Sequence, residues 1–444
     1  MGTLKLPKNN QFLLLKQNRF LPFFSSQFLG ALNDNIFRNS FVTLITFQSI
    51  SIFGINHIFL ANIAAFLFIL PFFLFSATAG QLADKYEKSL LMRRIKLLEI
   101  FLMSFAAFAL FSQDYLLMLI VLFLMGCQST LFSPVKYAYL PQKLSTSELI
   151  GGNALISSGT YIAIIFGLII GVESINFKSE HQFLLAFILV GISIIGYIVS
   201  QKIPHTEASD PNIKINLNIW KETLNIIRYS RKEKIVFISI LGISWFWFVA
   251  SAISIQMPAY AANIIKGNES IVTILLIAFA VGVGFGSLLC EKISNNKIQL
   301  GLAPVGSIGI GIFSIDLFFA QPQAASEVVR SISDFISHSQ NWRIIIDLIL
   351  IGACGGINSV PLYAIIQNKC RREYLSRVMA ANNILNSLFM VIAVVFCIFL
   401  LKKHVSIPQL FLCVGVLNIF VAIYIYSLAP EFVLHLTKLF KKNK

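Results

Sequence analysis

The chain has 444 residues, of which 57% are hydrophobic and only 12% are charged, with a formal net charge of +15. An ordinary soluble domain carries roughly 25% charged residues, so this composition excludes a single water-soluble core and predicts an integral membrane protein. The six cysteines show no CxxC spacing, so we expect neither a disulfide framework nor a metal site or cofactor.

Twelve stretches are long enough to cross a bilayer, for which about 20 apolar residues are required. We therefore predict an all-α protein of two six-helix bundles, residues 1–201 and 234–444, joined by a cytoplasmic linker over 202–233. The first apolar run is too long and too charged for a cleavable signal peptide, so we expect an uncleaved first span. The predicted spans are 20–47, 58–82, 96–112, 115–140, 152–174, 183–201, 234–261, 270–291, 298–320, 343–367, 377–401 and 406–429.

Basic residues gather in the connections on one side of the predicted membrane. With the amino terminus placed in the cytoplasm, most of the 35 Lys and Arg residues fall on the cytoplasmic side, which obeys the positive-inside rule. Both termini are therefore predicted to be cytoplasmic, and the basic excess predicts topology and not a nucleic-acid partner. The basic residues predicted elsewhere are Lys178, Lys266, Arg330, Arg343, Lys402 and Lys403, with Arg38 alone inside a span.

The first predicted span carries charges near its middle. Asp34 lies 14 residues after Phe20, about 21 Å along a helix, and Arg38 follows one turn later on the same face. One interpretation is an internal ion pair that fixes this helix; the other is a polar floor of a translocation pathway. Five polar or charged side chains within seven residues favour the second, so we predict that Asp34, Arg38, Asn33 and Asn35 bind substrate.

A block of the fourth span returns in the tenth. Ser133 and Tyr137 in FSPVKYAYLPQ match Ser359 and Tyr363 in SVPLYAIIQ. A repeat of half the chain length, built from membrane spans, is typical of two-bundle secondary transporters. Lys136 breaks the symmetry: either it extends to the cytoplasmic headgroups, or its ammonium holds a phosphate in a cavity.

Other polar residues in the spans have two interpretations. Asp316, Asp347 and Glu99 fall near predicted span ends, where interfacial solvation explains them. The asparagines of the tenth and eleventh spans are either interhelical hydrogen-bonding groups or cavity wall, and two of them, Asn358 and Asn382, are predicted to contact substrate.

The connections hold three further features. Residues 215–227 fit an amphipathic helix on the inner leaflet and fit a solvated linker equally well. His205 to Asp210 match the His-x4-Asp pattern of glycerolipid acyltransferases, but the linker has no room for a catalytic domain, so we predict no enzyme. In the outer loop 321–342, Val328, Ile332 and Phe335 recur at helical spacing and predict a short helix.

The segment GQLADKYEKS from Gly80 resembles the signature loop of the major facilitator superfamily. Through that resemblance Gly80, Asp84, Lys85 and Arg93 are expected to form a conformational switch, in which the aspartate binds a neighbouring helix end in one conformation. Glu87 stands where that family usually has glycine. The implied architecture is the major facilitator fold.

Four blocks, 28–40, 132–155, 286–306 and 355–389, resemble the bacterial lysophospholipid transporter branch of this superfamily. They are also similar to the transporter module fused to acyltransferase and acyl-carrier-protein synthetase enzymes. The resemblance implies that a lysophospholipid such as lysophosphatidylethanolamine moves by alternating access to the inner leaflet of the bacterial inner membrane. Asp34 and Lys136 correspond to the acidic and basic residues of the family's first and fourth spans.

The same resemblance implies reacylation by a cytoplasmic acyltransferase, expected here as a separate protein, and we expect the transporter itself to be a monomer. The stretch 245–260 lacks the basic residue that stand-alone members carry in the seventh span, which leaves headgroup preference open. The alternative function is a proton-coupled transporter of a small soluble metabolite, siderophore or drug, and a third is a non-transporting scaffold.

Overall fold

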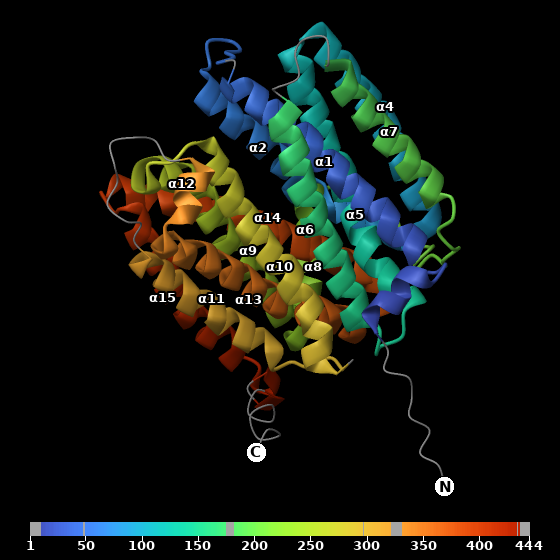
Figure 1. The fold of residues 1–444 in the computed structure, drawn as a ribbon. Coiled ribbons are helices and arrows are strands. Elements are labelled where there is room, and N and C mark those ends of the chain that lie inside the picture. The colour runs from blue at the N-terminus through green and yellow to red at the C-terminus, as the bar shows by residue number, and fades with distance from the viewer. Residues whose placement is uncertain are drawn as a thin grey trace.

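The computed structural model describes residues 10–435 except 48, 175–181, 296, 321–330 and 433. In this part of the chain every regular element is a helix, apart from one isolated bridge between Ile52 and Ile55. In Figure 1 the blue to green helices occupy one side of the molecule and the yellow to red helices the other. The all-helical fold predicted from composition is confirmed.

The N-terminal helices pack around an apolar core of their own, in which Phe37, Met103 and Leu122 are fully buried. Asp114 caps α5 and Glu87 caps α4 by accepting backbone hydrogen bonds in the first turn. The elements are η1 (Gln11–Lys16), α1 (Leu21–Phe47), α2 (His57–Leu74), α3 (Ser76–Lys85), α4 (Lys88–Ser112), α5 (Tyr115–Lys143), α6 (Leu149–Glu173) and α7 (Gln182–Ser200).

The C-terminal helices form a second core around Ile243, Leu348 and Phe411. A capping box of Ser406 and Gln409 starts the last helix. The elements are α9 (Lys234–Tyr260) with the π-turn η4 (Ala261–Ile265), α10 (Glu269–Ser294), α11 (Leu302–Phe319), α12 (Ile332–Ser337), α13 (Ser339–Lys369), η5 (Arg372–Tyr374), α14 (Leu375–Lys402) and α15 (Ile407–Ser427). The connection between the two groups contains α8 (Ile219–Ser230).

Ten of the described helices are long and apolar enough to cross a membrane, and the bent pair α2–α3 makes an eleventh candidate. The 27-residue helix α1 is not among them, because the polar side chains around Asp34 lower its hydropathy. The predicted span 58–82 was expected to be one helix, but the chain bends by 50° between Leu74 and Ser76.

Two other predicted elements differ in extent. The predicted span 96–112 is the end of a helix that already begins at Lys88. In the outer loop, α12 covers Ile332–Ser337, while Val328 lies outside the described residues. The loop itself is shorter than expected, because α13 begins at Ser339.

Glycines let α10 and α13 approach to backbone contact. A Cβ on Gly286 would collide with the carbonyl oxygen of Ala353, and one on Gly282 with that of Ile349. The contact is reciprocal, because a Cβ on Gly356 would lie 2.5 Å from the backbone nitrogen of Ser287. Small residues four apart on both helices are the usual means of close packing between helices in lipid.

Residues related by the sequence repeat meet between the two groups of helices. The rings of Tyr137 on α5 and Tyr363 on α13 stack with centroids 4.4 Å apart and an interplanar angle of 4°. These tyrosines lie towards the end of the bundle that carries Asp84, Lys143 and the segment 201–218, which we call the linker end. The repeat therefore marks a contact between the groups.

Candidate substrate site

The polar cluster of α1 is held by neighbouring helices. Asp34 accepts a hydrogen bond from Ser129 of α5, with 2.5 Å between Ser129 Oγ and Asp34 Oδ2. Arg38 donates to Asn35 Oδ1 at 2.8 Å, and its guanidinium carbon lies 5.5 Å from the centre of the Phe68 ring. The Asp34–Arg38 ion pair, the less favoured of the two interpretations, does not form among the described residues, and each side chain contacts another residue instead. Both remain partly exposed.

Lys136 lies on α5 about two turns before the helix ends at Lys143. Its Nζ lies 4.9 Å from the centre of the Tyr137 ring, and no hydrogen bond or ion pair occupies this ammonium in the described part of the chain. Lys136 lies about two turns after Ser129 on the same face of α5, and Ser129 is the residue that binds Asp34. A partly buried ammonium without a partner is available to an anionic group of a ligand.

The C-terminal helices contribute amides of two kinds. Asn358 accepts a hydrogen bond from the Tyr426 hydroxyl at 2.6 Å and therefore acts as a link between helices. Asn382 is fully buried near the Tyr363 hydroxyl, and neither polar atom of its amide has a hydrogen-bond partner among the described residues. Asn358 is thus held by another helix of its own group, whereas Asn382 lies beside the Tyr363 hydroxyl.

A buried ion pair lies behind the α1 cluster. Lys96 Nζ and Glu99 Oε2 are 2.6 Å apart, and both side chains are 1% exposed. Gln128 donates to Glu99 at 3.2 Å, and Asn33 donates to Glu99 and to the carbonyl of Leu189. The predicted substrate residue Asn33 thus belongs to the inside of the N-terminal helices.

This pair corrects two expectations. Glu99 was expected at the membrane interface and Lys96 in a cytoplasmic connection, but α4 begins at Lys88, so both lie well inside the helix. The signal in the sequence was the i,i+3 spacing of opposite charges, which places them on one face.

Asp347 was also expected to be solvated at the membrane interface, and it too is buried. Its side chain is buried, and its Oδ2 has no hydrogen-bond partner among the described residues. Asp316, in contrast, is 37% exposed and binds Arg343 through two hydrogen bonds, of 2.5 and 3.1 Å. Solvation at the interface therefore explains Asp316 but not Asp347.

Asp84 joins the two groups of helices at the linker end. It is fully buried and accepts hydrogen bonds from the backbone nitrogens of Ser376 and Arg377, the second and third residues of α14. The Arg377 side chain donates to the same carboxylate at 2.9 Å. Asp84 therefore caps α14 from another helix and pairs with a cation in its first turn.

The other residues predicted for the switch have separate contacts. Gly80 lets α3 lie on α14, because a Cβ there would come within 2.8 Å of the Ala380 Cβ and 2.9 Å of the Arg377 Cα. Arg93 donates to the carbonyl of Ile203, the second residue of the predicted linker, at 2.8 Å. Lys85 is partly exposed, and no side-chain contact is described for it.

The linker segment 203–216 forms hydrogen bonds with several helices at the linker end. Lys88 donates to Ser209 at 2.7 Å, and Asp210 accepts a 3.1 Å hydrogen bond from Arg377, the residue that also binds Asp84. The segment with the His205–Asp210 motif therefore connects α4 and α14 through hydrogen bonds.

Thr206 of this segment and Glu87 together cap α4. The backbone nitrogen and the hydroxyl of Thr206 both donate to the Glu87 carboxylate. Burial tends to raise the pKa of Glu87, but hydrogen bonds from Ser89, Thr206 and Leu90 outweigh it and lower the pKa to about 2.

The hydrogen bonds that join the two groups lie in the half of the bundle nearer the linker end. Asn153 of α6 donates to Gln367 of α13 at 2.6 Å, and the Ser158 hydroxyl donates to the carbonyl of Gly284 at 2.5 Å. Ser133 of α5 and Asn383 of α14 add a further hydrogen-bonded pair, with 2.9 Å between Asn383 Nδ2 and Ser133 Oγ. Several polar contacts thus join the two groups in the half of the molecule nearer the linker end.

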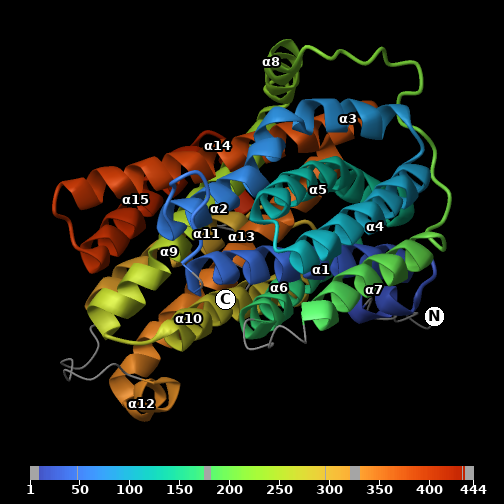
Figure 2. The same ribbon diagram turned by 90° about the horizontal axis from the view of Figure 1, so that it is seen from above.

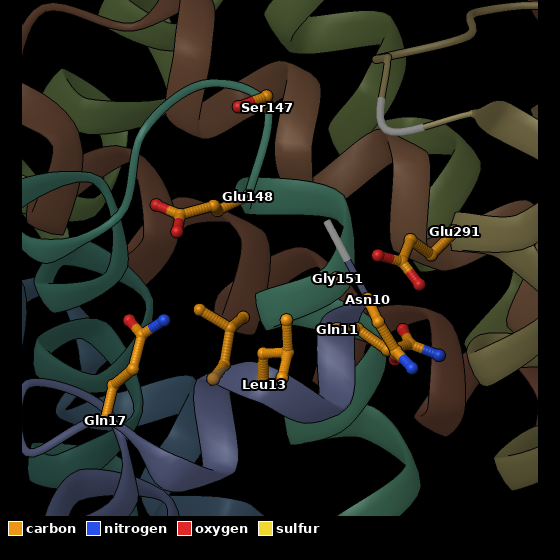
Figure 3. Close-up of a pocket in the computed structure, with 9 residues that line it drawn as sticks. Asn10, Gln11, Leu13, Gln17, Ser147, Glu148, Gly151 and Glu291 are labelled. Carbon is orange, nitrogen blue, oxygen red and sulfur yellow. The ribbon is translucent and has the colours of Figure 1, made fainter. Parts of the chain in front are cut away.

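A small pocket lies beside η1, away from the predicted residues (Figure 3). Glu148 and Glu291 lie on either side of Gln11, whose amide nitrogen donates to the carbonyl of Leu288 at 3.0 Å. Glu148 is already paired with Arg19 at 2.5 Å. The pocket is lined by Asn10, Gln11, Leu13, Leu14, Gln17, Ser147, Glu148, Gly151 and Glu291.

The molecule consists of two groups of helices, ten of them long and apolar enough to cross a membrane among the described residues, with polar residues between the groups. Its fold is similar to that of the Escherichia coli fucose:proton symporter FucP, with a TM-score of 0.65 and 14% identity over 92% of this chain and 98% of that one. It is also similar to the human organic anion transporter MFSD10, with a TM-score of 0.67 and 12% identity over 90% of this chain and 99% of that one.

The profile of the Major Facilitator Superfamily matches residues 23–394, and the chain belongs to this family. It is 23% identical to the lysophospholipid transporter LplT of Photorhabdus laumondii over 69% of this chain and 70% of the relative. The LplT of Escherichia coli O157:H7 is likewise 23% identical, over 77% of this chain and 83% of the relative. The protein is therefore a transporter and not an enzyme.

Proposed function

We propose that this transporter carries lysophospholipids. The observation that carries the proposal is an ammonium without an ion-pair partner among the described residues, Lys136, on the same face of α5 as Ser129, which binds the partly exposed carboxylate of Asp34. A headgroup such as phosphoethanolamine has an anionic phosphate and a cationic amine. The phosphate fits Lys136 and Arg38, and the amine fits Asp34. The relatives named lysophospholipid transporters support this choice of substrate class.

The architecture that we propose has twelve spans in two six-helix bundles, residues 1–201 and 234–444, with 202–233 as a cytoplasmic linker. Helix α1 is the twelfth span, and its partly exposed Asp34 and Arg38 face the substrate pathway instead of lipid. Both termini and the linker end lie on the cytoplasmic side. The structure then corresponds to a state closed towards the cytoplasm, with Asp84–Arg377 among the contacts that hold it closed.

We propose transport from the outer to the inner leaflet of the bacterial inner membrane. There a separate acyltransferase restores the second acyl chain, and the transporter acts as a monomer. Alternate opening of the pathway to each leaflet requires breaking the Asp84 cap on α14. The single acyl chain stays in an apolar environment during this movement.

The test is uptake of labelled lysophosphatidylethanolamine by spheroplasts that express the chain with a co-expressed acyltransferase, which traps the product as diacyl lipid. A hydrogen bond to a charged group contributes about 1.5–3 kcal/mol, so Asp34→Asn and Lys136→Ala should each reduce uptake roughly tenfold or more. Lys136→Arg keeps the cation, and Lys403→Ala removes an exposed cation remote from the site; both should retain most of the activity.

Wild-type uptake in both Asp34→Asn and Lys136→Ala, with equal amounts of folded protein, would contradict the site. No uptake by well-folded wild-type protein would contradict the substrate. A soluble substrate would then be sought by proton flux, since a proton-coupled transporter predicts a rate set by the pH gradient and lost in Asp34→Asn.

A further inference from the structure

Helix α8 exposes large apolar side chains beside the bundle. Trp220 and Leu224 are 65% and 62% exposed, and Leu217, just before the helix, is 77% exposed. The spacing of four residues places Trp220 and Leu224 on one face of α8, and Leu217 lies three residues before Trp220, outside the helix. Such a stripe in contact with water would be unfavourable, so its surroundings need an explanation.

The opposite face of α8 fixes the direction of this stripe. Ile226 is buried in a small apolar cluster with Ala77 of α3 and Ala380 of α14. One turn later, the Tyr229 ring stacks on that of Tyr374 with centroids 4.1 Å apart. Because this face is packed against the protein, α8 is unable to roll and bury Trp220 and Leu224.

Positive charge surrounds the stripe. Lys214, Lys221 and Arg228 are exposed, and their side chains have no ion-pair partner in the described part of the chain. Arg231 and Lys232, also exposed, follow directly after the helix. The surface next to the stripe is therefore strongly basic and free to bind anionic groups.

The position of α8 places this surface beside a membrane span. Figure 2 shows α8 at the edge of the bundle next to α3, with its axis crossing that of α14. The Trp220 ring lies edge-on to Phe73, with centroids 6.2 Å apart, and Phe73 belongs to α2 just before its bend. Trp220 thus contacts the bent candidate span α2–α3 next to its bend.

We propose that α8 is an interfacial helix that binds anionic phospholipids of the adjoining leaflet. Leu217, Trp220 and Leu224 enter the boundary between acyl chains and headgroups, while Lys221 and Arg228 bind headgroup phosphates. Apolar insertion with flanking Lys and Arg is the recognised chemistry of interfacial helices, and tryptophan favours this depth. A solvated linker would leave both the stripe and the free cations unexplained.

The first test uses the emission of Trp220, obtained as the difference between wild type and Trp220→Phe in reconstituted vesicles. Brominated lipids quench a tryptophan that they touch, whereas iodide quenches one that faces water. We expect brominated phosphatidylglycerol to quench Trp220 more strongly than brominated phosphatidylcholine, and iodide to have little effect. Quenching of Trp220 by iodide alone would overturn the proposal, because α8 would then face water or a soluble partner.

The second test measures the phosphatidylglycerol retained by purified protein. Lys221→Gln with Arg228→Gln should weaken the preference for phosphatidylglycerol roughly tenfold or more at low salt, because each basic residue near the surface adds to the attraction. Lys402→Gln with Lys403→Gln removes equal charge from an exposed position and should change nothing. Equal retention in the two double variants would overturn the anionic preference, whatever substrate the transporter carries.

Discussion

Replacing Glu99 by glutamine should destabilise the N-terminal helices strongly. The carboxylate accepts hydrogen bonds from Lys96, Gln128 and Asn33, and it neutralises a lysine whose side chain is only 1% exposed. Glutamine has nearly the same shape but no charge. The variant therefore leaves the Lys96 ammonium buried without a counter-ion.

The size of the loss follows from the charge that is left behind. Removing one partner of a buried ion pair costs about 3–5 kcal/mol, because the remaining charge has no compensation away from water. We therefore expect Glu99→Gln to reduce the free energy of unfolding by about 3–5 kcal/mol.

The assay is denaturant unfolding of the purified protein in detergent, measured for Lys96→Met, Glu99→Gln and the double variant. The double variant removes both charges, so it should recover most of the loss and show a coupling of about 2–4 kcal/mol. A loss below about 1 kcal/mol in Glu99→Gln, or simple additivity in the cycle, would refute the reasoning, because the pair would then be hydrated.

Three other changes have defined outcomes. Arg377→Met leaves Asp84 buried without its cation, so the linker end should open; the distance between spin labels on α3 and α14 should lengthen, and an unchanged distance would argue against this contact. The pKa of Glu87 is lowered to about 2 from an ordinary value of 4.5, so its contribution is complete above about pH 4.5 and is lost as pH falls towards 2. The difference in melting temperature between wild type and Glu87→Gln should shrink over that window and stay constant above it. Gly286→Leu should cost more than about 2 kcal/mol because a Cβ meets the Ala353 carbonyl, whereas Gly191→Leu, where a Cβ meets no atom within 4 Å, should be tolerated in the same unfolding assay.

Two consecutive residues of α5 bind two different carboxylates, one buried and one partly exposed. Gln128 donates to the buried Glu99, while its neighbour Ser129 donates to the partly exposed Asp34. The Lys96–Glu99 pair is satisfied within the N-terminal helices. Lys136, in contrast, has no charged partner among the described residues, as a ligand site requires.

The sequence by itself determined the all-helical membrane architecture, the approximate positions of most long helices and the family. In lipid, each span has to satisfy its own backbone hydrogen bonds and therefore forms a helix. A long apolar stretch, which is a local property of the sequence, is thus enough to predict a helix. The Gly80 loop likewise predicted that Asp84 would bind a helix end, and the described contact with α14 agrees with it. The repeat predicted that the blocks around Tyr137 and Tyr363 are equivalent.

Only the tertiary structure decided which polar side chains satisfy one another. The i,i+4 spacing allowed Asp34 to meet Arg38, but Ser129 of another helix holds the carboxylate instead. The sequence placed Glu99 at the membrane interface, which was wrong. Its distance from water depends on where α4 begins and on which helices cover it, and the sequence showed neither. Partners such as Asp84 and Arg377 are 293 residues apart, and no local pattern specifies such a contact. Burial and pairing arise from the packing of helices, and this packing decides whether a charge is structural or free to bind a ligand.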